Sequence, residues 1–277
     1  MACPTHSRVS SGSLLQVGVD TYRLPGAPTG AVAELHALML DIGGEVWASG
    51  PTAAALHGFD GYRLRPPFHV TILRDRNVRR TGHHIHTSGS LDLIDRTVVD
   101  GLACTSGART LIDLARTEDI GRLTVALDSG LRDGKFTESL VHRRIVALRS
   151  SGRFGIPRLL DAVEGVDASR GGHSFLEREY LRALSGAGLP LPTTQALLTR
   201  AGDHLVRVDF RFDGTPVVVE VLGYHSHHTK QQLRCDTERM DALLADGFSP
   251  YQFTYDHVVS DPGDVVAVTR RALVPYL

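Results

Sequence analysis

The pattern of apolar and polar positions divides the chain into an arm, a mixed N-terminal half, an all-helical middle and an ordered C-terminal third. Between residues 31 and 118, helical spacing of apolar residues alternates with short strand-like runs, which is typical of an α+β domain. Residues 119–168 carry only helical patterns, and we interpret them as a helical connector. Residues 1–30 are rich in Ser, Thr, Gly and Pro and are expected to form a loose arm.

Several segments of the N-terminal half carry signals for single elements. "AVAELHALMLDIG" has apolar residues at helical spacing, and "SGPTAAALHGF" begins with a Ser-Gly-Pro start signal, so each predicts a helix. "PFHVTIL" and "HHIHTSG" predict two strands, and the three histidines of the second strand are expected to face solvent. "CTSGARTLIDLAR" predicts an N-capped helix with one buried side.

Residues 169–277 show a compact order of helix, strand, strand, helix, strand and helix. The predicted elements are Ser174–Ala187, Leu205–Phe212, Val217–Leu222, Thr229–Asp246, Pro250–Tyr255 and Pro262–Leu273. Ser174 and Glu177 have the spacing of a capping box, which predicts the start of the first helix. The segment "GVDASRGG", Gly165–Gly172, is the expected linker before this domain. The chain is therefore assigned to the α/β class, with an α+β N-terminal half.

One carboxylate of the predicted strands needs a physical explanation, because Glu220 lies within the apolar run Pro216–Leu222. Burying an ionised carboxylate is costly unless a cation or hydrogen bonds compensate it. The preceding strand carries Asp209 on its polar face. A two-residue turn, Asp213–Gly214, would make this aspartate a diagonal neighbour of the glutamate, and a four-residue loop, Asp213–Pro216, would set the two directly opposite. Either loop brings the Cβ atoms within about 5–8 Å on one face, whereas a three-residue loop would separate them.

Two carboxylates this close repel each other unless a positive charge lies between them. A hard divalent cation such as Mg²⁺ is one solution, because Mg²⁺ takes oxygen ligands and usually only one or two carboxylates. Salt bridges to Arg207 or Arg211 are the alternative. For Glu177, a third acid in this region, the capping box is an equally complete explanation.

The same segments resemble a known family. "SFLERE", "VDF", "VVVEVLGYHSHH" and "RCDTERMDALLADGFSPYQFT", in this order, are similar to the Vsr-like domain of the PD-(D/E)XK nuclease superfamily, over about Gly172–Leu277. The resemblance implies a restriction-endonuclease-like α/β/α core with a mixed sheet, which hydrolyses phosphodiesters with Mg²⁺ or Mn²⁺. It implies metal-binding roles for three residues, which are Glu177, Asp209 and Glu220. It also matches Asp236 and Arg239 to the family's Asp-x-x-Arg helix signature.

The chain departs from the family pattern at Leu222. The superfamily usually has Lys two residues after the acid of this strand, and Vsr-like members often have Asp or His. A leucine can neither polarise a water molecule nor stabilise developing charge. Four residues just beyond the strand could substitute for it, namely His225, His227, His228 and Lys230. We select His227 as the candidate base or proton shuttle.

The N-terminal half resembles a second family. "SGPTAAALHGF", "FHVTILRDRNVRRTGHHIHTS" and "GLACTSGARTLIDLAR" are similar to the AbiEi-type antitoxin and regulator family of bacteria, over about Leu35–Arg116. That family normally begins with a winged helix-turn-helix, of which only "GVDTYRLPG" has a counterpart here, so we interpret residues 1–30 as its remnant. The resemblance implies a regulator of a type IV toxin–antitoxin system, with DNA and a toxin as partners.

The composition limits where nucleic-acid contacts can be sought. With 30 Lys and Arg against 31 Asp and Glu, the formal net charge is −1, so contacts with DNA must come from local patches. The candidate phosphate contacts are Arg143, Arg144, Arg149, Lys230 and Arg234. Three widely spaced cysteines form neither a disulfide framework nor a zinc motif, which fits a reducing cytosol. No apolar run approaches the length of a membrane span, so a cytoplasmic protein is expected.

The sequence therefore supports two functional hypotheses. The first is a metal-dependent endonuclease acting on DNA, with Asp209, Glu220 and His227 as catalytic residues. The alternative is a catalytically inactive, AbiEi-like antitoxin or DNA-binding regulator that uses the nuclease fold as a binding platform, and Leu222 favours it.

Overall fold

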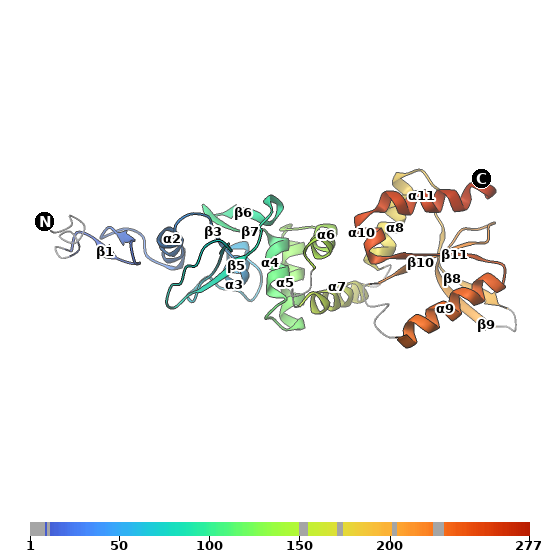
Figure 1. Ribbon diagram of the computed structural model, residues 1–277, viewed down its shortest axis with the longest axis horizontal. Helices are drawn as coiled ribbons and strands as arrows, with labels where there is room; N and C mark the ends of the chain where they lie inside the picture. Colours follow the sequence, from blue (N-terminus) through green and yellow to red (C-terminus); the bar gives the residue numbers. More distant parts are fainter. Residues whose placement is uncertain (1–8, 10–11, 150–154, 171–173, 201–203, 224–229) are drawn as a thin grey trace. The chain divides into compact units, whose positions relative to one another are not determined.

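The computed structural model (Figure 1) describes residue 9 and residues 12–149, 155–170, 174–200, 204–223 and 230–277. The chain divides into two compact units. The N-terminal unit comprises residues 1–145 and 149–162, and the C-terminal unit comprises residues 146–148 and 163–277. Each unit combines helices with a mixed sheet, so the predicted α/β class is confirmed. No helix among the described residues has both the length and the apolar character needed to cross a lipid bilayer.

A five-stranded sheet with the order β5-β4-β3-β7-β6 forms the centre of the N-terminal unit. Its strands are β3 (Val46–Ala48), β4 (His69–Leu73), β5 (His84–Ser88), β6 (Arg96–Val99) and β7 (Leu102–Thr105). Strand β3 is antiparallel to β4 and parallel to β7, β4 is parallel to β5, and β6 is antiparallel to β7. A separate hairpin joins β1 (Leu15–Gln16) to β2 (Tyr22–Arg23). The two strands predicted from the sequence are confirmed as β4 and β5, whereas β3, β6 and β7 were not predicted.

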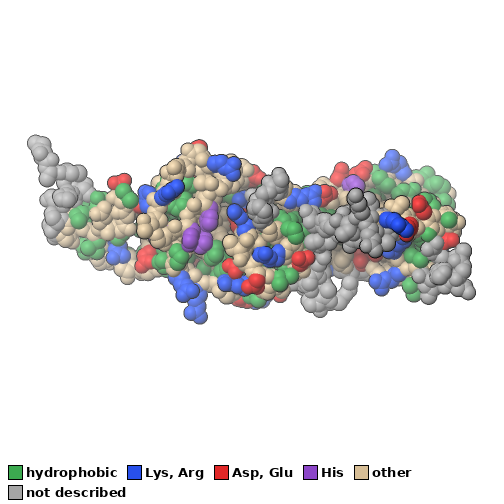
Figure 2. All heavy atoms as spheres, turned by 60° about the horizontal axis from the view of Figure 1, so that its bottom comes forward, with side chains coloured by type: hydrophobic (Ala, Val, Ile, Leu, Met, Phe, Trp, Pro, Cys, Tyr) green, Lys and Arg blue, Asp and Glu red, His purple; other side chains and the backbone are tan. Residues whose placement is uncertain are grey.

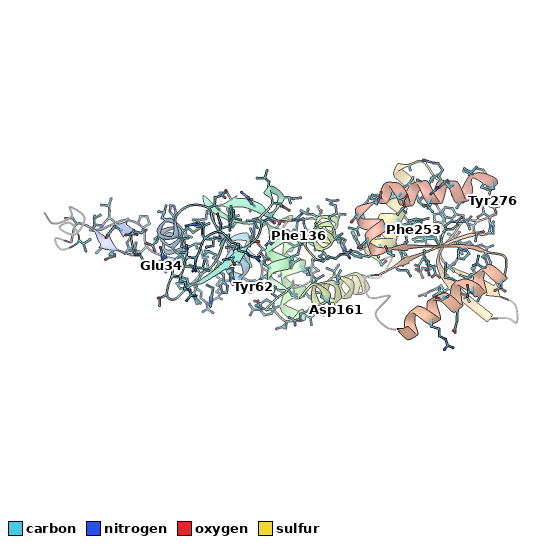
Figure 3. The ribbon with its side chains drawn as sticks, in the orientation of Figure 1. Glu34, Tyr62, Phe136, Asp161, Phe253 and Tyr276 are labelled. Atoms are coloured by element: carbon cyan, nitrogen blue, oxygen red, sulfur yellow. The ribbon has the colours of Figure 1, made fainter. Side chains whose placement is uncertain are left out.

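Helices cover this sheet and continue beyond it. They are α2 (Ala31–Ile42), α3 (Gly50–His57), η1 (Leu93–Asp95), α4 (Gly107–Leu114), α5 (Ile120–Arg132), α6 (Glu138–Leu148) and α7 (Ile156–Arg170). The core beneath them includes Leu35, Val70 and Ile72, all fully buried. Phe136, labelled in Figure 3, packs edge-on against Phe59 with 5.9 Å between ring centroids. Every regular element in the described part of residues 119–168 is a helix, as predicted.

Most of the segment Gly165–Gly172, which we expected to be a linker, is helical, because α7 continues to Arg170. Buried apolar residues at helical spacing, such as Leu159, Leu160 and Val163, anchor the first half of this helix. Their burial outweighs the cost of about 1 kcal/mol that a glycine adds within a helix. The division between the two units falls at residues 162 and 163, within this helix and close to the expected linker.

The C-terminal unit has a four-stranded mixed sheet between two helical layers. Its elements are α8 (Phe175–Gly186), β8 (Thr193–Arg200), β9 (His204–Arg211), β10 (Val217–Leu222), α9 (Lys230–Ala245), β11 (Ser249–Thr254), α10 (Tyr255–Ser260), α11 (Pro262–Leu273) and η2 (Val274–Tyr276). The strand order is β11-β10-β9-β8, with β10 and β11 parallel and the other two pairs antiparallel. Figure 1 shows α8, α10 and α11 on one side of the sheet and α9 on the other. All six predicted elements are confirmed within a residue or two, and β8 and α10 are additional.

Aromatic packing holds α8 against the sheet. The ring of Tyr180 lies 4.7 Å from that of Phe210 and 5.8 Å from that of Phe253, which Figure 3 labels among the side chains of this unit. Ser174 caps the helix, because its hydroxyl oxygen accepts a hydrogen bond of 3.3 Å from the amide of Glu177. The predicted capping spacing is confirmed in this respect, and it places Glu177 in the first turn, facing the sheet region with little exposure.

Candidate functional site

The hairpin of β9 and β10 brings the two strand carboxylates together. Arg211 pairs with Val218 and Phe210 pairs with Val219, while the amide of Phe212 donates to the carbonyl of Val217 at 3.1 Å. The connection is therefore the four-residue loop of residues 213–216, and the two-residue turn is wrong. Extending this register by one pair sets residue 209 opposite residue 220, as the longer loop predicted.

The backbone ladder between β9 and β10 ends at these carboxylates. In an antiparallel ladder of this register, the amide of Val221 would next donate to the carbonyl of Val208. It donates instead to Asp209 Oδ2, at 3.0 Å. The aspartate carboxylate thus takes the place of a backbone acceptor, and its position is fixed where the two strands stop pairing.

Asp209 and Glu220 stand opposite each other on adjacent strands, and we call this pair the acidic row. Two amide side chains lie beside the acidic row on the neighbouring strands. On one side, β8 pairs with β9 immediately before and after Gln195, which sets Gln195 opposite Asp209. On the other side, Gln252 of β11 pairs with Glu220. Gln195 Nε2 donates to Glu177 Oε1 at 3.0 Å, and Gln252 Nε2 lies 3.4 Å from Glu220 Oε2. Gln195 has a left-handed backbone with φ of 50°, which is uncommon for a residue other than glycine. Sequence reasoning missed both glutamines, because neither carries a motif and β8 was not predicted.

The environment of Asp209 disfavours its negative charge. Burial raises the pKa of this carboxyl, and the nearby carboxylate of Glu177 raises it further. The hydrogen bond from Val221 and the positive charges of Arg239 and Arg207 act in the opposite direction. The helix acid and the strand acid therefore lie close enough for mutual repulsion, which a bound cation would relieve.

An arginine supplies the charge compensation of Glu220. The glutamate is 5% exposed, and its Oε1 lies 2.6 Å from Arg239 Nη2. The same guanidinium group donates to the backbone carbonyl of Arg207. Compensation by arginine was the expected alternative to a metal, but it comes from helix α9 through the residue matched to the Asp-x-x-Arg signature. Arg207, one of the two hairpin arginines considered as a salt-bridge partner, provides its backbone carbonyl as an acceptor for Arg239.

The acids have the donor chemistry of a Mg²⁺ site without forming a complete ligand cluster. No group of three or more His, Cys, Asp or Glu side chains in the described part of the chain is arranged to hold a metal ion. Asp209 Oδ1 accepts no hydrogen bond from another described residue, since only Oδ2 is engaged by Val221. Because Mg²⁺ usually binds through one or two carboxylates and water, Asp209 with one neighbouring acid is a chemically suitable donor set.

Part of the predicted site lies outside the described residues. This applies to His225, His227 and His228, and to the side chains of Lys230 and Asp236. Leu222 is the last residue of β10 and is partly buried, so the departure from the family pattern falls at the end of the strand. Arg234 is exposed on α9 and forms an ion pair of 2.7 Å with Glu238.

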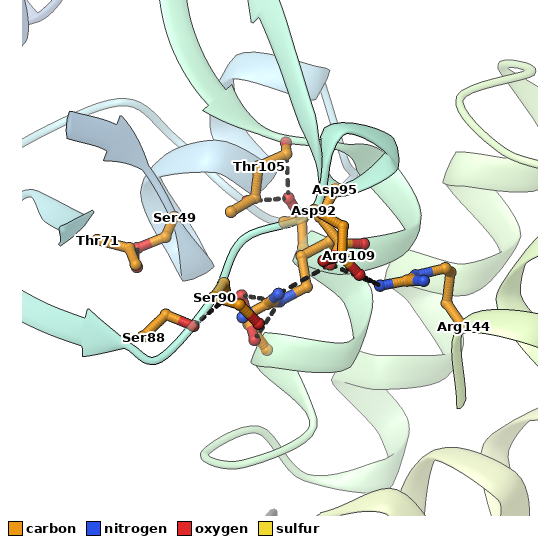
Figure 4. A network of polar contacts seen from close by, with 11 residues as sticks. Ser49, Thr71, Ser88, Ser90, Asp92, Asp95, Thr105, Arg109 and Arg144 are labelled. Carbon is orange, nitrogen blue, oxygen red and sulfur yellow. Dashed lines mark hydrogen bonds and ion pairs between the residues drawn. The ribbon is translucent and has the colours of Figure 1, made fainter. Parts of the chain in front are cut away.

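The other predicted phosphate contacts lie in α6 and at its end, and they differ in exposure. Arg143 is exposed and Arg149 is partly buried. Arg144 is buried, and its Nη2 lies 2.7 Å from Asp95 and 3.1 Å from Asp92 (Figure 4). We therefore remove Arg144 from the candidate phosphate contacts, because its guanidinium group is engaged in a buried ion network.

Comparisons with known proteins give two relatives that span both units. The proteins described as Uncharacterized protein MT2308, from Mycobacterium tuberculosis strain CDC 1551 / Oshkosh, and Uncharacterized protein Rv2248, from strain ATCC 25618 / H37Rv, are each 26% identical to this chain over 278 residues. The similarity covers 96% of this chain and 94% of each relative. No protein-family model matches the chain. No solved structure matches it.

Proposed function

We propose that the C-terminal unit is a divalent-cation-dependent phosphodiesterase of the endonuclease type, with DNA as its substrate. One observation carries the proposal: the register of β9 and β10 sets Asp209 opposite Glu220, and Glu177 of α8 is hydrogen-bonded to Gln195 of β8, which stands beside Asp209. The order of these acids along the chain agrees with the Vsr-like resemblance. Three elements, α8, β9 and β10, therefore each contribute a carboxylate near the point where β9 and β10 stop pairing.

Each of the three acids has a defined part in this proposal. Asp209 and Glu220 would hold Mg²⁺ or Mn²⁺, with Glu177 assisting. The bound cation would polarise the scissile phosphate and lower the pKa of an attacking water molecule. The amide of Val221 orients Asp209, and Gln195 orients Glu177 through their 3.0 Å hydrogen bond.

Proton transfer is assigned to His227, which follows β10 in the chain. A histidine is suited to accept a proton from water and to return it to the leaving group near neutral pH. We further propose a cytoplasmic location for this activity, which is supported by the three widely spaced cysteines.

A second candidate function is supported by a specific contact. Arg239 already compensates Glu220, and Leu222 stands where the superfamily usually has a lysine. In this alternative the unit is an inactive nuclease fold within an AbiEi-like regulator, which binds DNA or a toxin without cleaving either.

Metal binding and cleavage distinguish the two functions. Wild-type protein is expected to melt at a higher temperature with Mn²⁺ and to cleave DNA with Mg²⁺ or Mn²⁺. Both effects should be lost in Asp209→Asn and Glu220→Gln. Glu238→Gln is the matched control, because it removes an exposed carboxylate from α9 without touching the row.

The regulator is the better description if Mn²⁺ leaves the melting temperature unchanged and the protein shifts its own promoter DNA in a gel without cleaving it. The nuclease proposal fails if no DNA substrate is cleaved with either cation. It also fails if both row variants cleave as fast as wild type.

A further inference from the structure

The N-terminal unit contains a polar cavity that neither proposed function uses. It has a volume of about 490 Å³, which is within the range of roughly 300–1,000 Å³ typical of small-molecule sites. The start of α3, strands β4 and β5, and helix α4 with the residues after it form its walls. The cavity is thus built from segments far apart in the sequence.

Arginines dominate the charged side chains of the cavity. Arg74 and Arg116 are exposed and form no ion pair with another described residue. The buried Arg109 also lines the cavity, and its Nη2 group makes no hydrogen bond within the described part of the chain. The one acid of the lining is Asp113, and Arg109 Nε holds both of its oxygens, at 3.0 and 3.1 Å. The lining therefore has an excess of positive charge.

Helix α3 begins at the cavity without a side-chain cap. Ser49 is its N-cap residue and is 2% exposed, but its hydroxyl oxygen accepts from Thr71 Oγ1 at 2.9 Å and caps no amide of the helix. The first amides of a helix have no acceptor within the helix, and the helix dipole is positive at this end. Gly50 and Pro51 line the cavity, so this end adds to the field of the arginines.

Two histidines, His69 and His86, also line the cavity. His69 Nδ1 and His86 Nε2 are 3.1 Å apart and share a hydrogen bond, so one ring donates and the other accepts. The ring of His84 lies against that of His69, with 4.3 Å between the ring centroids and an angle of 33° between the ring planes. Figure 2 shows histidine side chains gathered on the surface of this unit. A proton added to this pair would increase the positive charge of the cavity when an anion is present.

From this combination we infer that the cavity binds a phosphate group of a nucleotide-sized ligand. Arg74 and Arg116 line the cavity and are exposed, so their guanidinium groups can form charge-assisted hydrogen bonds to phosphate oxygens. The buried Arg109 and the start of α3 provide donors deeper in the cavity. The phosphate can belong to a free mononucleotide or to the 5′ end of a DNA strand, since both present the same group.

Calorimetric titration of the full chain with four probes tests this inference. The probes are inorganic phosphate, AMP, adenosine and a short 5′-phosphorylated oligonucleotide. We expect AMP or the oligonucleotide to bind and adenosine not to bind. The phosphate ester with the higher affinity, AMP or the oligonucleotide, identifies the source of the phosphate. An Arg74→Gln/Arg116→Gln variant should bind about tenfold more weakly or worse, because two charged hydrogen-bond donors are lost.

Arg79→Gln is the matched control, since Arg79 lies in the same β4–β5 connection, is exposed and does not line the cavity. It should bind like wild type. Equal binding of adenosine and AMP, no binding of any phosphate probe, or full affinity in the double variant would overturn the inference. The Asp209→Asn variant should bind the phosphate probes with wild-type affinity. The test of the cavity is therefore independent of the test of the nuclease proposal.

Discussion

Arg239 Nη2 of α9 lies 2.6 Å from Glu220 Oε1 of β10, so a guanidinium group stands beside a carboxylate that is 5% exposed. This ion pair accounts for a glutamate within the apolar run of β10. The pair also joins a helix to the strand row that includes Asp209. Its partners differ in environment, because the arginine side chain is 42% exposed whereas that of the glutamate is buried.

Arg239→Gln should destabilise the protein in the absence of metal. Removing one partner of a fully buried pair costs about 3–5 kcal/mol, but water reaches the exposed arginine, so we expect about 1–2 kcal/mol. Urea denaturation in EDTA measures this loss. Saturating Mn²⁺ should restore most of it if the acids bind a cation. A loss equal to that of Arg234→Gln, an exposed arginine of the same helix, would contradict the expectation.

Asp209→Asn should raise the melting temperature at neutral pH without metal. Burial and Glu177 raise the pKa of Asp209, so its charged form opposes folding, and this penalty develops as the pH rises from the unfolded pKa of about 3.9 to the raised folded pKa. The stabilising effect of the substitution should therefore vanish at low pH and grow as the pH rises. An asparagine oxygen can still accept from the amide of Val221.

The same variant should lose its response to Mn²⁺. A cation at 100 times its dissociation constant stabilises a folded protein by about 2.7 kcal/mol, and this gain should be absent in Asp209→Asn. Differential scanning fluorimetry at pH 5 and pH 8, with and without Mn²⁺, separates the two effects. A wild-type-like Mn²⁺ response in the variant would argue against Asp209 as a ligand.

Asp95→Asn should be among the most destabilising substitutions in the N-terminal unit. Asp95 Oδ2 lies 3.0 Å from Arg109 and 2.7 Å from Arg144, and both arginines are buried (Figure 4). Losing the charge that they share should cost about 3–5 kcal/mol in chemical denaturation. Asp92→Asn is the control, because Asp92 is 57% exposed and should cost less than about 1 kcal/mol.

His69 should make the N-terminal unit less stable in acid. Burial and, to a smaller extent, the positive charges that His84 and His86 acquire together lower the pKa of His69 to about 4. An unfolded histidine binds its proton near pH 6.5, so the stabilisation is present above pH 6.5 and is lost as the pH falls toward 4. His69→Gln should flatten the dependence of the unfolding free energy on pH in this window. The exposed His36→Gln should leave it unchanged.

Much of the C-terminal fold followed from local signals. The alternation of Val208 and Phe210 with polar residues predicted β9, and the capping residues predicted the start of α8. Strand β8 was not predicted, because its sequence, "TTQALLTR", has little alternation and takes its conformation from pairing with β9. The helical conformation of most of the segment Gly165–Gly172 was not predicted for a similar reason, since a helix anchored by packing overrode local composition.

Residue types and spacing were sufficient to identify the carboxylates Asp209 and Glu220 and to limit their relation to a few loop lengths. The loop length, the pairing of Glu220 with Arg239, and the amides that flank the acids required the three-dimensional structure. Glu220 contacts Arg239, 19 positions later in the chain, and Gln252, 32 positions later. The physical reason is that periodicity records which face of an element is buried, whereas the partner on that face depends on sheet register and helix packing, which no local segment contains.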